Sequence, residues 1–380
     1  MNLVIFASDA KGLSSLNSII EEANSLGIKL FAMVTQSTQL KHPVYQQGDF
    51  EILTNVERKS VVKSETLGVE LPFKPDWLLV NRERWNPELD IIKEFKLKFN
   101  SKIGLVEPNA HILNNAESRL EAYSKSRFTD LIDIFFVHSS QAKLQQQLAG
   151  FTGNMVVVGN PKYDLNLKQD RSTLAQLEKI YNIDPSKKQV LLFSLVNQHR
   201  SGINKIFHNI ITSEPQHQYF YKPYPGEPFD QKFKNDYYPK FFLDNCTPIL
   251  EENHIWGMFS ICNKHVGCMS SITHATLLTN SEYQDVSLEL DIPQKYLDFS
   301  GVLQEGGPGL ENNKQMWMRS FGFTKETQLR ELLSSNYKKE IEKLNNKVWD
   351  NLENPKELLI LFDDYNDGNA SKRIINELQK

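Results

Sequence analysis

The sequence contains little that would place the chain in a membrane or in an oxidising compartment. No apolar run approaches the roughly 20 residues of a bilayer-spanning helix, and Asp9 and Lys11 interrupt the first apolar run, so a signal-peptide pattern is missing. The three cysteines, Cys246, Cys262 and Cys268, cannot all pair with one another, and a chain of 380 residues needs no disulfide to stabilise its core. We therefore expect a cytoplasmic protein.

Several motifs of nucleotide and hydrolase chemistry are also missing. The sequence has no Walker A motif, no GxGxxG and no GxSxG, which disfavours nucleoside-triphosphate hydrolysis, Rossmann-type dinucleotide binding and α/β-hydrolase chemistry. A formal net charge of −4 and a pI near 6.2 give no overall positive field that would draw the chain to nucleic acid, although a local basic groove is compatible with both values. DNA as a partner is therefore open but not favoured.

Two stretches resemble metal sites only in part. In CNKHVGC (262–268) the cysteine spacing matches no common zinc framework, so we predict buried structural thiols. In FDDYNDGN (362–369) Tyr365 occupies the third ligand position of a calcium loop and no glutamate closes it, so we predict a turn that ends a helix. We expect no metal ion and no cofactor.

The first half of the chain alternates short apolar strands with helical patterns. Such alternation is typical of a parallel sheet with helices on both faces, and we predict an open, doubly wound sheet that ends near residue 160. The predicted strands are 2–7, 28–34, 76–81, 102–107, 133–138 and 154–159, with a further short strand near 51–54.

The second half repeats the pattern. Strands are predicted at 189–196, 219–225, 265–271 and 285–290, and helical patterns at 325–350 and 355–380. We expect an α/β fold with two Rossmann-like, doubly wound domains that face a central cleft, followed by C-terminal helices. The predicted divisions are an acceptor-binding domain at 1–165, a linker at 166–188, a donor-binding domain at 189–325 and helices that pack back across the domains at 326–380.

Ser270 and Ser271 lie where a short apolar strand runs into a helix, within HVGCMSSITHATLL (265–278). The first N–H groups of a helix lack partners and carry partial positive charge, so two hydroxyls there suit a phosphate. Plain N-capping needs only one hydroxyl, and a capped strand–helix joint is the alternative interpretation.

Three motifs carry a resemblance to a known family. VVVGNPKYDL (156–165) resembles the strand and "GNPRFD" joint of bacterial surface-carbohydrate transferases and nucleotide-sugar 2-epimerases. KPYPGE (222–227) resembles their "KPHPxE" turn, and GCMSSITHATLL (267–278) resembles their "SSxxxEA" phosphate site. The motifs occur in the family's order and cover about a third of the chain. The sequence is therefore similar to GT-B glycosyltransferases of the capsule, teichoic-acid and lipopolysaccharide type.

The resemblance implies a donor site in the second domain. Ser270 and Ser271 would meet the pyrophosphate at the helix start, with Lys222 and Tyr224 on a neighbouring loop. Tyr224 stands where the family has histidine, and His274 stands where the family has the glutamate that commonly holds the donor ribose. Phenol and imidazole both form hydrogen bonds, but these departures leave the donor nucleotide and sugar open.

The loop after the first strand of the second domain carries further polar residues. Its position suits contacts to the diphosphate or to the transferred sugar, and Arg200 has the geometry to pair bidentately with phosphate. A polar loop that caps a helix is the alternative. The predicted donor-binding residues in this loop are Ser194, Asn197, His199 and Arg200.

Catalysis in an inverting transferase needs a base that takes the proton of the acceptor hydroxyl, and we expect this base in the first domain. Glu107 ends a predicted strand and His111 follows it; related glycerophosphate transferases carry a histidine after the equivalent strand, so this pair is the first choice. Asp9, after the first strand, is the second. The alternatives are a turn-capping carboxylate for Glu107 and a helix N-cap for Asp9.

Arg82 and Arg84 follow another predicted strand and are candidates for steering an anionic acceptor, although both are equally compatible with solvated surface arginines. The joint between the domains is predicted at Gly159, Asn160 and Pro161, which set a turn, with Asp164 capping the following segment.

We predict a metal-independent glycosyltransferase that moves a sugar from a nucleotide-sugar donor to a hydroxyl acceptor, first of all a glycan. Three alternatives stay open: a nucleotide-sugar 2-epimerase, a phage-type DNA glycosyltransferase that acts on a hydroxymethylated base, and a nucleotide-sugar-binding protein without catalysis. The last is suggested by the Tyr224 and His274 departures.

Overall fold

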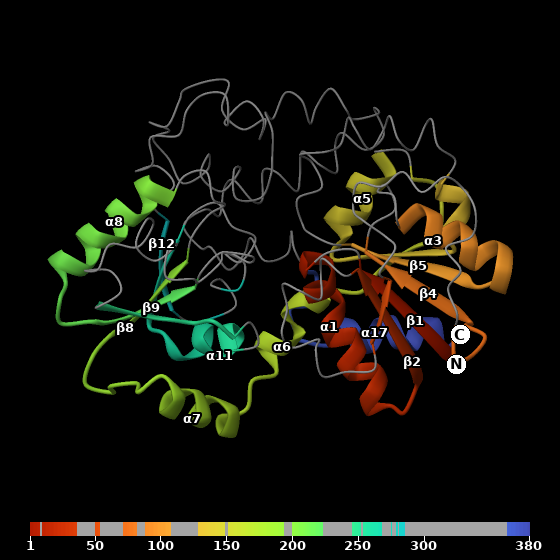
Figure 1. Cartoon of the computed structure of the whole chain (residues 1–380). Helices are drawn as coiled ribbons and strands as arrows, with labels where there is room; N and C mark the ends of the chain where they lie inside the picture. The colour runs from red at the N-terminus through yellow and green to blue at the C-terminus, as the bar shows by residue number, and fades with distance from the viewer. Residues whose placement is uncertain are drawn as a thin grey trace. The chain divides into compact units, whose positions relative to one another are not determined.

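The computed structural model of the whole chain divides into two compact units (Figure 1). Unit 1 begins at Met1, ends its first segment at Asp164 and includes the C-terminal residues; unit 2 begins at Leu165. The residues that the structure describes are 1–7, 10–35, 50–53, 71–81, 88–107, 128–148, 151–193, 200–222, 245–251, 254–267, 275, 279, 281–285 and 363–380.

Unit 1 is built on a parallel sheet of seven described strands in the order β3-β2-β1-β4-β5-β6-β7. β1 lies between β2 and β4, so the winding direction of the chain reverses between β1 and β4. All seven predicted strands of the first half are confirmed. Their bounds are β1 (Asn2–Ala7), β2 (Lys29–Thr35), β3 (Phe50–Leu53), β4 (Trp77–Val80), β5 (Lys102–Val106), β6 (Ile134–Val137) and β7 (Met155–Val157).

Both faces of this sheet are covered by helices, which explains why its strands are apolar without interruption. On one face, Leu3 and Ile5 of β1 pack with residues of α1 (Ala10–Ser25) and α17 (Ala370–Leu378). On the other face, Val4 and Phe6 pack with residues of α3 (Glu88–Glu94), the π-helical turn η2 (Phe95–Phe99) and α5 (Ser140–Leu148). A 3-10 turn, η4 (Phe128–Leu131), precedes β6.

Unit 2 contains a parallel sheet of five described strands in the order β10-β9-β8-β11-β12. The strands are β8 (Gln189–Phe193), β9 (Gln218–Lys222), β10 (Cys246–Pro248), β11 (Lys264–Gly267) and β12 (Glu282–Asp285). The described helices are α7 (Arg171–Ile180), α8 (Arg200–Ser213) and α11 (His254–Ile261). β12 begins three residues before the predicted strand, whose residues 286–290 lie outside the described part of the chain.

The C-terminal helix belongs to the core of unit 1. Ile374, Ile375 and Leu378 of α17 are buried against the sheet, and α17 lies beside α1 (Figure 1). The turn predicted at 362–369 is present from Asp363 onward, and α17 begins only at Ala370, so the helix predicted over 355–380 is wrong for residues 363–369. Residues 355–362 lie outside the described part of the chain. Positive φ angles at Asn366 (48°) and Gly368 (70°) end any helical path there.

The joint between the units starts with η5 (Pro161–Tyr163), which the Asn160 side chain caps by accepting the Lys162 N–H, and continues into the short helix α6 (Asp164–Leu167). The buried Asp164 carboxylate accepts the N–H groups of Ala370 (3.2 Å) and Ser371 (2.7 Å). Asp164 was expected to cap the segment after it. The structure shows that it caps α17, more than 200 residues later in the chain.

Among the described residues, no helix has the length and apolar character needed to cross a membrane. The segment 166–188, which we predicted as a linker, contains α7, and Leu177 of α7 packs against Gly257 of α11 within unit 2. The predicted domain boundaries stay predictions.

Candidate functional site

Three strands of unit 2 end side by side. In the register of the sheet, Phe193 at the end of β8 is the partner of both Lys222 at the end of β9 and Gly267 at the end of β11. The winding direction reverses between β8 and β11, and ligands of open α/β sheets bind outside the carboxyl ends of the strands at such a point. The chain therefore leaves the sheet here at three adjacent positions.

These strand ends lead directly into the predicted donor-binding loops. Lys222, a partly buried residue, is the last residue of β9, and Arg200 is the first residue of α8. The structure thus brings together the starting points of the predicted segments. The remaining predicted donor-binding residues lie outside the described part of the chain: Ser194, Asn197 and His199 follow β8, Tyr224 follows β9, and Ser270, Ser271 and His274 follow β11.

Gly267 allows β8 and β11 to lie this close at their ends. A Cβ at Gly267 would overlap the aromatic ring of Phe193, which is itself buried. Sequence reasoning did not single out either residue. The available signal was a glycine at the end of an apolar strand, which often marks a close approach of another group to the backbone.

In unit 1, three adjacent strands are each followed by a buried polar residue. Asn81 follows β4, Glu107 follows β5 and His138 follows β6, and none of the three side chains is more than 2% exposed. Within the described part of the chain, neither the nitrogen nor the oxygen of the Asn81 amide has a hydrogen-bond partner. Glu107 was predicted from the sequence as a catalytic residue, and this role stays a prediction; Asn81 and His138 were missed.

Glu107 is held at both carboxylate oxygens. The backbone N–H of His138 donates to Oε2 (3.1 Å), and Nε2 of Gln146 on α5 donates to Oε1 (3.3 Å). The His138 ring also contacts Glu107. Its Nε2 lies 2.8 Å from the Glu107 carbonyl oxygen, and its Nδ1 lies 3.6 Å from Oε2. Burial lowers the pKa of His138 to about 3, partly opposed by the Glu107 backbone contact, and the positive charge of Lys162 lowers it further.

The other predicted residues of unit 1 also follow strands that are neighbours. β1 and β4 are paired up to Phe6 and Val80, so the segments that carry Asp9 and Arg82 leave the sheet at adjacent points. This is where the winding of unit 1 reverses. Asp9, Arg82, Arg84 and His111 themselves lie outside the described residues.

Two of the three cysteines are described, and both are free and buried, as predicted for Cys262. Burial raises the pKa of the Cys246 and Cys262 thiols. Within the described residues, no three histidine, cysteine, aspartate or glutamate side chains are grouped so that they would hold a metal ion.

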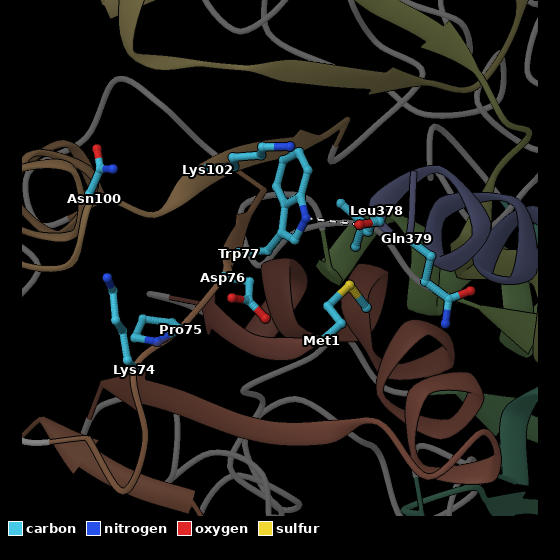
Figure 2. A pocket seen from close by; sticks show the side chains of 9 residues that line it. All are labelled: Met1, Lys74, Pro75, Asp76, Trp77, Asn100, Lys102, Leu378 and Gln379. Atoms are coloured by element: carbon cyan, nitrogen blue, oxygen red, sulfur yellow. Dashed lines mark hydrogen bonds between the residues drawn. The ribbon is translucent and has the colours of Figure 1, made fainter.

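A hollow of about 650 Å³ lies at the opposite, amino-terminal edge of the unit 1 sheet. Figure 2 shows its wall, in which Lys102 lies over the Trp77 ring (5.2 Å) and the Trp77 indole N–H donates to the Leu378 carbonyl oxygen (2.9 Å). None of the residues predicted for donor binding, acceptor binding or catalysis lines it.

No protein-family model matches the sequence, and a search of curated proteins finds no match. Solved structures of similar fold do match. The UDP-GlcNAc 2-epimerase from Neisseria meningitidis bound to UDP-GlcNAc is 15% identical, with 100% of both chains covered and a TM-score of 0.61. The wall teichoic acid polymerase TagF is 12% identical, with 99% of this chain and 88% of that chain covered and a TM-score of 0.59.

A third match is S. aureus MnaA in complex with UDP, at 14% identity, 100% and 96% coverage and a TM-score of 0.56. At these identities the likeness establishes the fold. The chain has the α/β fold of the GT-B type, with two Rossmann-like parallel sheets and a C-terminal helix, and this confirms the fold that the sequence motifs predicted.

Proposed function

We propose that the chain is a nucleotide-sugar-dependent glycosyltransferase that transfers a sugar to a hydroxyl acceptor, first of all a glycan, in the cytoplasm. One observation carries the proposal. The ends of β8, β9 and β11 are in register, and each leads into a segment with the predicted phosphate-binding residues. Two of the proteins with a similar fold were determined with UDP-GlcNAc or UDP bound, which supports a nucleotide-sugar ligand.

The donor diphosphate is placed beside Lys222 in this proposal. Lys222 supplies a positive charge at the end of β9, and Ser270 and Ser271 supply hydroxyl groups together with the N–H groups of a helix start. These groups offset the negative charge of the departing nucleotide, so no metal ion is required. A chelator such as EDTA is therefore expected to leave the transfer rate unchanged.

The acceptor is assigned to unit 1. Glu107, with His111 close in sequence, is the first choice for the base that takes the acceptor proton, and Asp9 is the second. Arg82 and Arg84 are assigned to an anionic acceptor. Because the Glu107 carboxylate is closed to water in the structure, we expect the acceptor hydroxyl to reach it only when both substrates are bound.

The first test is binding of nucleotide sugars. A panel of nucleotide sugars and free nucleotides is screened by thermal unfolding, and a ligand at 100 times its Kd should stabilise the folded chain by about 2.7 kcal/mol. Lys222→Ala should weaken the binding about tenfold or more, as the loss of a charge-assisted contact to phosphate predicts.

Lys188→Ala is the matched control. Lys188 lies in the same unit, just before β8 at the amino-terminal edge, and pairs with Glu282 on the surface (2.6 Å). Its loss should leave binding unchanged. If no nucleotide or nucleotide sugar raises the unfolding temperature, or if both variants weaken binding equally, the proposed donor site is wrong.

A nucleotide-sugar 2-epimerase is the second candidate, and one observation favours it. The Neisseria meningitidis epimerase is matched over the whole length of both chains, whereas 88% of TagF is covered. An epimerase converts its nucleotide sugar without any acceptor, so product analysis in the absence of acceptor separates the two activities.

A further inference from the structure

The Glu107 and His138 side chains form a buried pair at the ends of β5 and β6. We propose that His138 is the positioning residue of Glu107: when the Glu107 carboxylate takes a proton, that proton is shared between Glu107 Oε2 and His138 Nδ1. The use of this pair as the catalytic base rests on the proposed function. The shared proton itself does not, because it follows from the geometry of the pair.

The contacts of the His138 ring fix its tautomer. Nε2 of this ring lies 2.8 Å from the backbone carbonyl oxygen of Glu107. A carbonyl oxygen only accepts hydrogen bonds, so Nε2 must carry the proton. In a neutral imidazole the other nitrogen, Nδ1, then carries a lone pair.

The other ring nitrogen of His138, Nδ1, is buried and has no hydrogen-bond partner among the residues that the structure describes, which is costly for a polar atom. The nearest carboxylate oxygen, Glu107 Oε2, lies 3.6 Å away, too far for a hydrogen bond. Two groups without a proton between them are expected to stay apart in this way. At this separation the two atoms form no hydrogen bond, and a proton on Oε2 would supply the donor that Nδ1 lacks among the described residues.

The Glu107 carboxylate has a fixed direction. The His138 N–H and the Gln146 side chain hold its two oxygens, and this leaves Oε2 facing Nδ1. Lys162 on η5 is the charged side chain that acts on His138 from a neighbouring element, and its positive charge disfavours a second positive charge on the ring. The captured proton accordingly stays bonded to Oε2 and is donated to Nδ1.

In the reaction, the buried pair therefore gains a hydrogen bond at the moment when Glu107 takes the proton. The acceptor O–H bond breaks, its proton bonds to Oε2, and the acceptor oxygen forms the new bond to the sugar while the nucleotide leaves. Only then does Nδ1 receive a hydrogen bond. An interaction that is made in the transition state and missing in the ground state lowers the barrier.

The position of the shared proton is tested without any substrate. The ring nitrogens of ¹⁵N-histidine-labelled protein are followed by NMR as the pH is lowered, and the His138 signals are assigned by their loss in His138→Gln. We expect one protonated nitrogen, Nε2, and one unprotonated Nδ1 near neutral pH, with Nδ1 moving toward a hydrogen-bonded value on acidification. In Glu107→Gln this movement should be absent or displaced in pH.

Glu214→Gln is the matched control, because Glu214 Oε2 lies 3.1 Å from Nε2 of His217 in unit 2. This variant should change the His217 signals and leave those of His138 as they are. A protonated Nδ1 at neutral pH, or the same Nδ1 titration in Glu107→Gln as in the unchanged chain, overturns the proposal.

The role in catalysis is tested by the pH profile of transfer. In His138→Gln, kcat should fall about tenfold or more, a part of the 10²–10⁴ that a general base contributes, with little change in the donor KM. Its acid limb should move to lower pH, because the protonated carboxyl has lost its acceptor. A fall in kcat with an unmoved acid limb contradicts the role. If the NMR signature is present and no nucleotide sugar reacts, the pair stands and the proposed function falls.

Discussion

Among the described residues, each unit has one buried histidine at the strand next to an edge of its sheet: His138 follows β6, and His265 lies in β11. The two histidines differ in what lies next to them. His138 in unit 1 and His265 in unit 2 are both closed to solvent, and burial lowers their pKa to about 3 and about 4. His138 faces the Glu107 carboxylate, whereas the His265 ring lies nearly perpendicular to the Phe259 ring, with 5.0 Å between the ring centroids. Burial alone favours the neutral form of both imidazole rings. Only His138 has a carboxylate beside it with which it can share a proton.

The described strand ends differ as well. In unit 1 the residues directly after β4, β5 and β6 are polar and buried. In unit 2 the last residues of β8 and β11, Phe193 and Gly267, pack against each other. Buried polar side chains thus mark the described strand ends of unit 1, and a close approach of two strands marks the ends of β8 and β11 in unit 2. Three substitutions test this difference.

The largest effect is expected for His138→Leu. The change removes the ring N–H that donates to the buried Glu107 carbonyl oxygen, so unfolding in urea should show a loss of about 3 kcal/mol. His265→Leu, which loses no bond to a carboxyl group, is the comparison. Equal losses in the two variants would show that the carboxylate makes no difference.

An intermediate effect is expected for Gly267→Ala, because the new Cβ meets the stiff Phe193 ring. We expect a loss of about 1–3 kcal/mol in the free energy of unfolding, the usual cost of overpacking. Gly104→Ala in β5 of unit 1 should cost less, since its Cβ meets the flexible end of Leu79. Adding Phe193→Leu should restore part of the stability lost in Gly267→Ala and none of that lost in Gly104→Ala.

The smallest effect at neutral pH is expected for His265→Leu itself, less than about 1.5 kcal/mol for an apolar residue of similar size. Its pH dependence is larger. The pKa of His265 lies near 4 in the fold and near 6.5 when unfolded, so the unfolded chain binds the extra proton as the pH falls between these values. The unchanged chain should lose up to about 1.4 kcal/mol per pH unit there. The variant should have a shallower slope; equal slopes would mean that His265 is protonated in the fold.

Much of the fold could be predicted because the information is local. Strands such as β1 and β8 are buried on both faces, so their sequences are apolar throughout. Strands that are short or polar were harder. β10 (Cys246–Pro248) contains a proline at the sheet edge, and α11 (His254–Ile261) is a short apolar run that periodicity cannot distinguish from a strand.

The site was predictable in location and less so in its contacts. A polar residue at the end of a buried strand indicates a site, which led to Glu107, whereas Lys222 was found through the resemblance of KPYPGE (222–227) to a family motif. The same rule applied to 133–138 would have found His138. By contrast, the pairing of Asp164 with α17 depends on contacts between residues more than 200 positions apart, and no local pattern encodes it.

The position of α17 in the core of unit 1 also determines when this unit can finish folding during synthesis. The ribosome synthesises the seven described strands of this sheet first and Ile374, Ile375 and Leu378 last. The Asp164 carboxylate can therefore cap α17 only after the end of the chain has been synthesised. Every described element of unit 2 is synthesised in between. Domains usually fold in the order of their synthesis. Here unit 1 begins first but can complete its core only after unit 2 has been translated. Until then, the apolar residues of unit 1 that α17 covers in the folded chain lack these contacts.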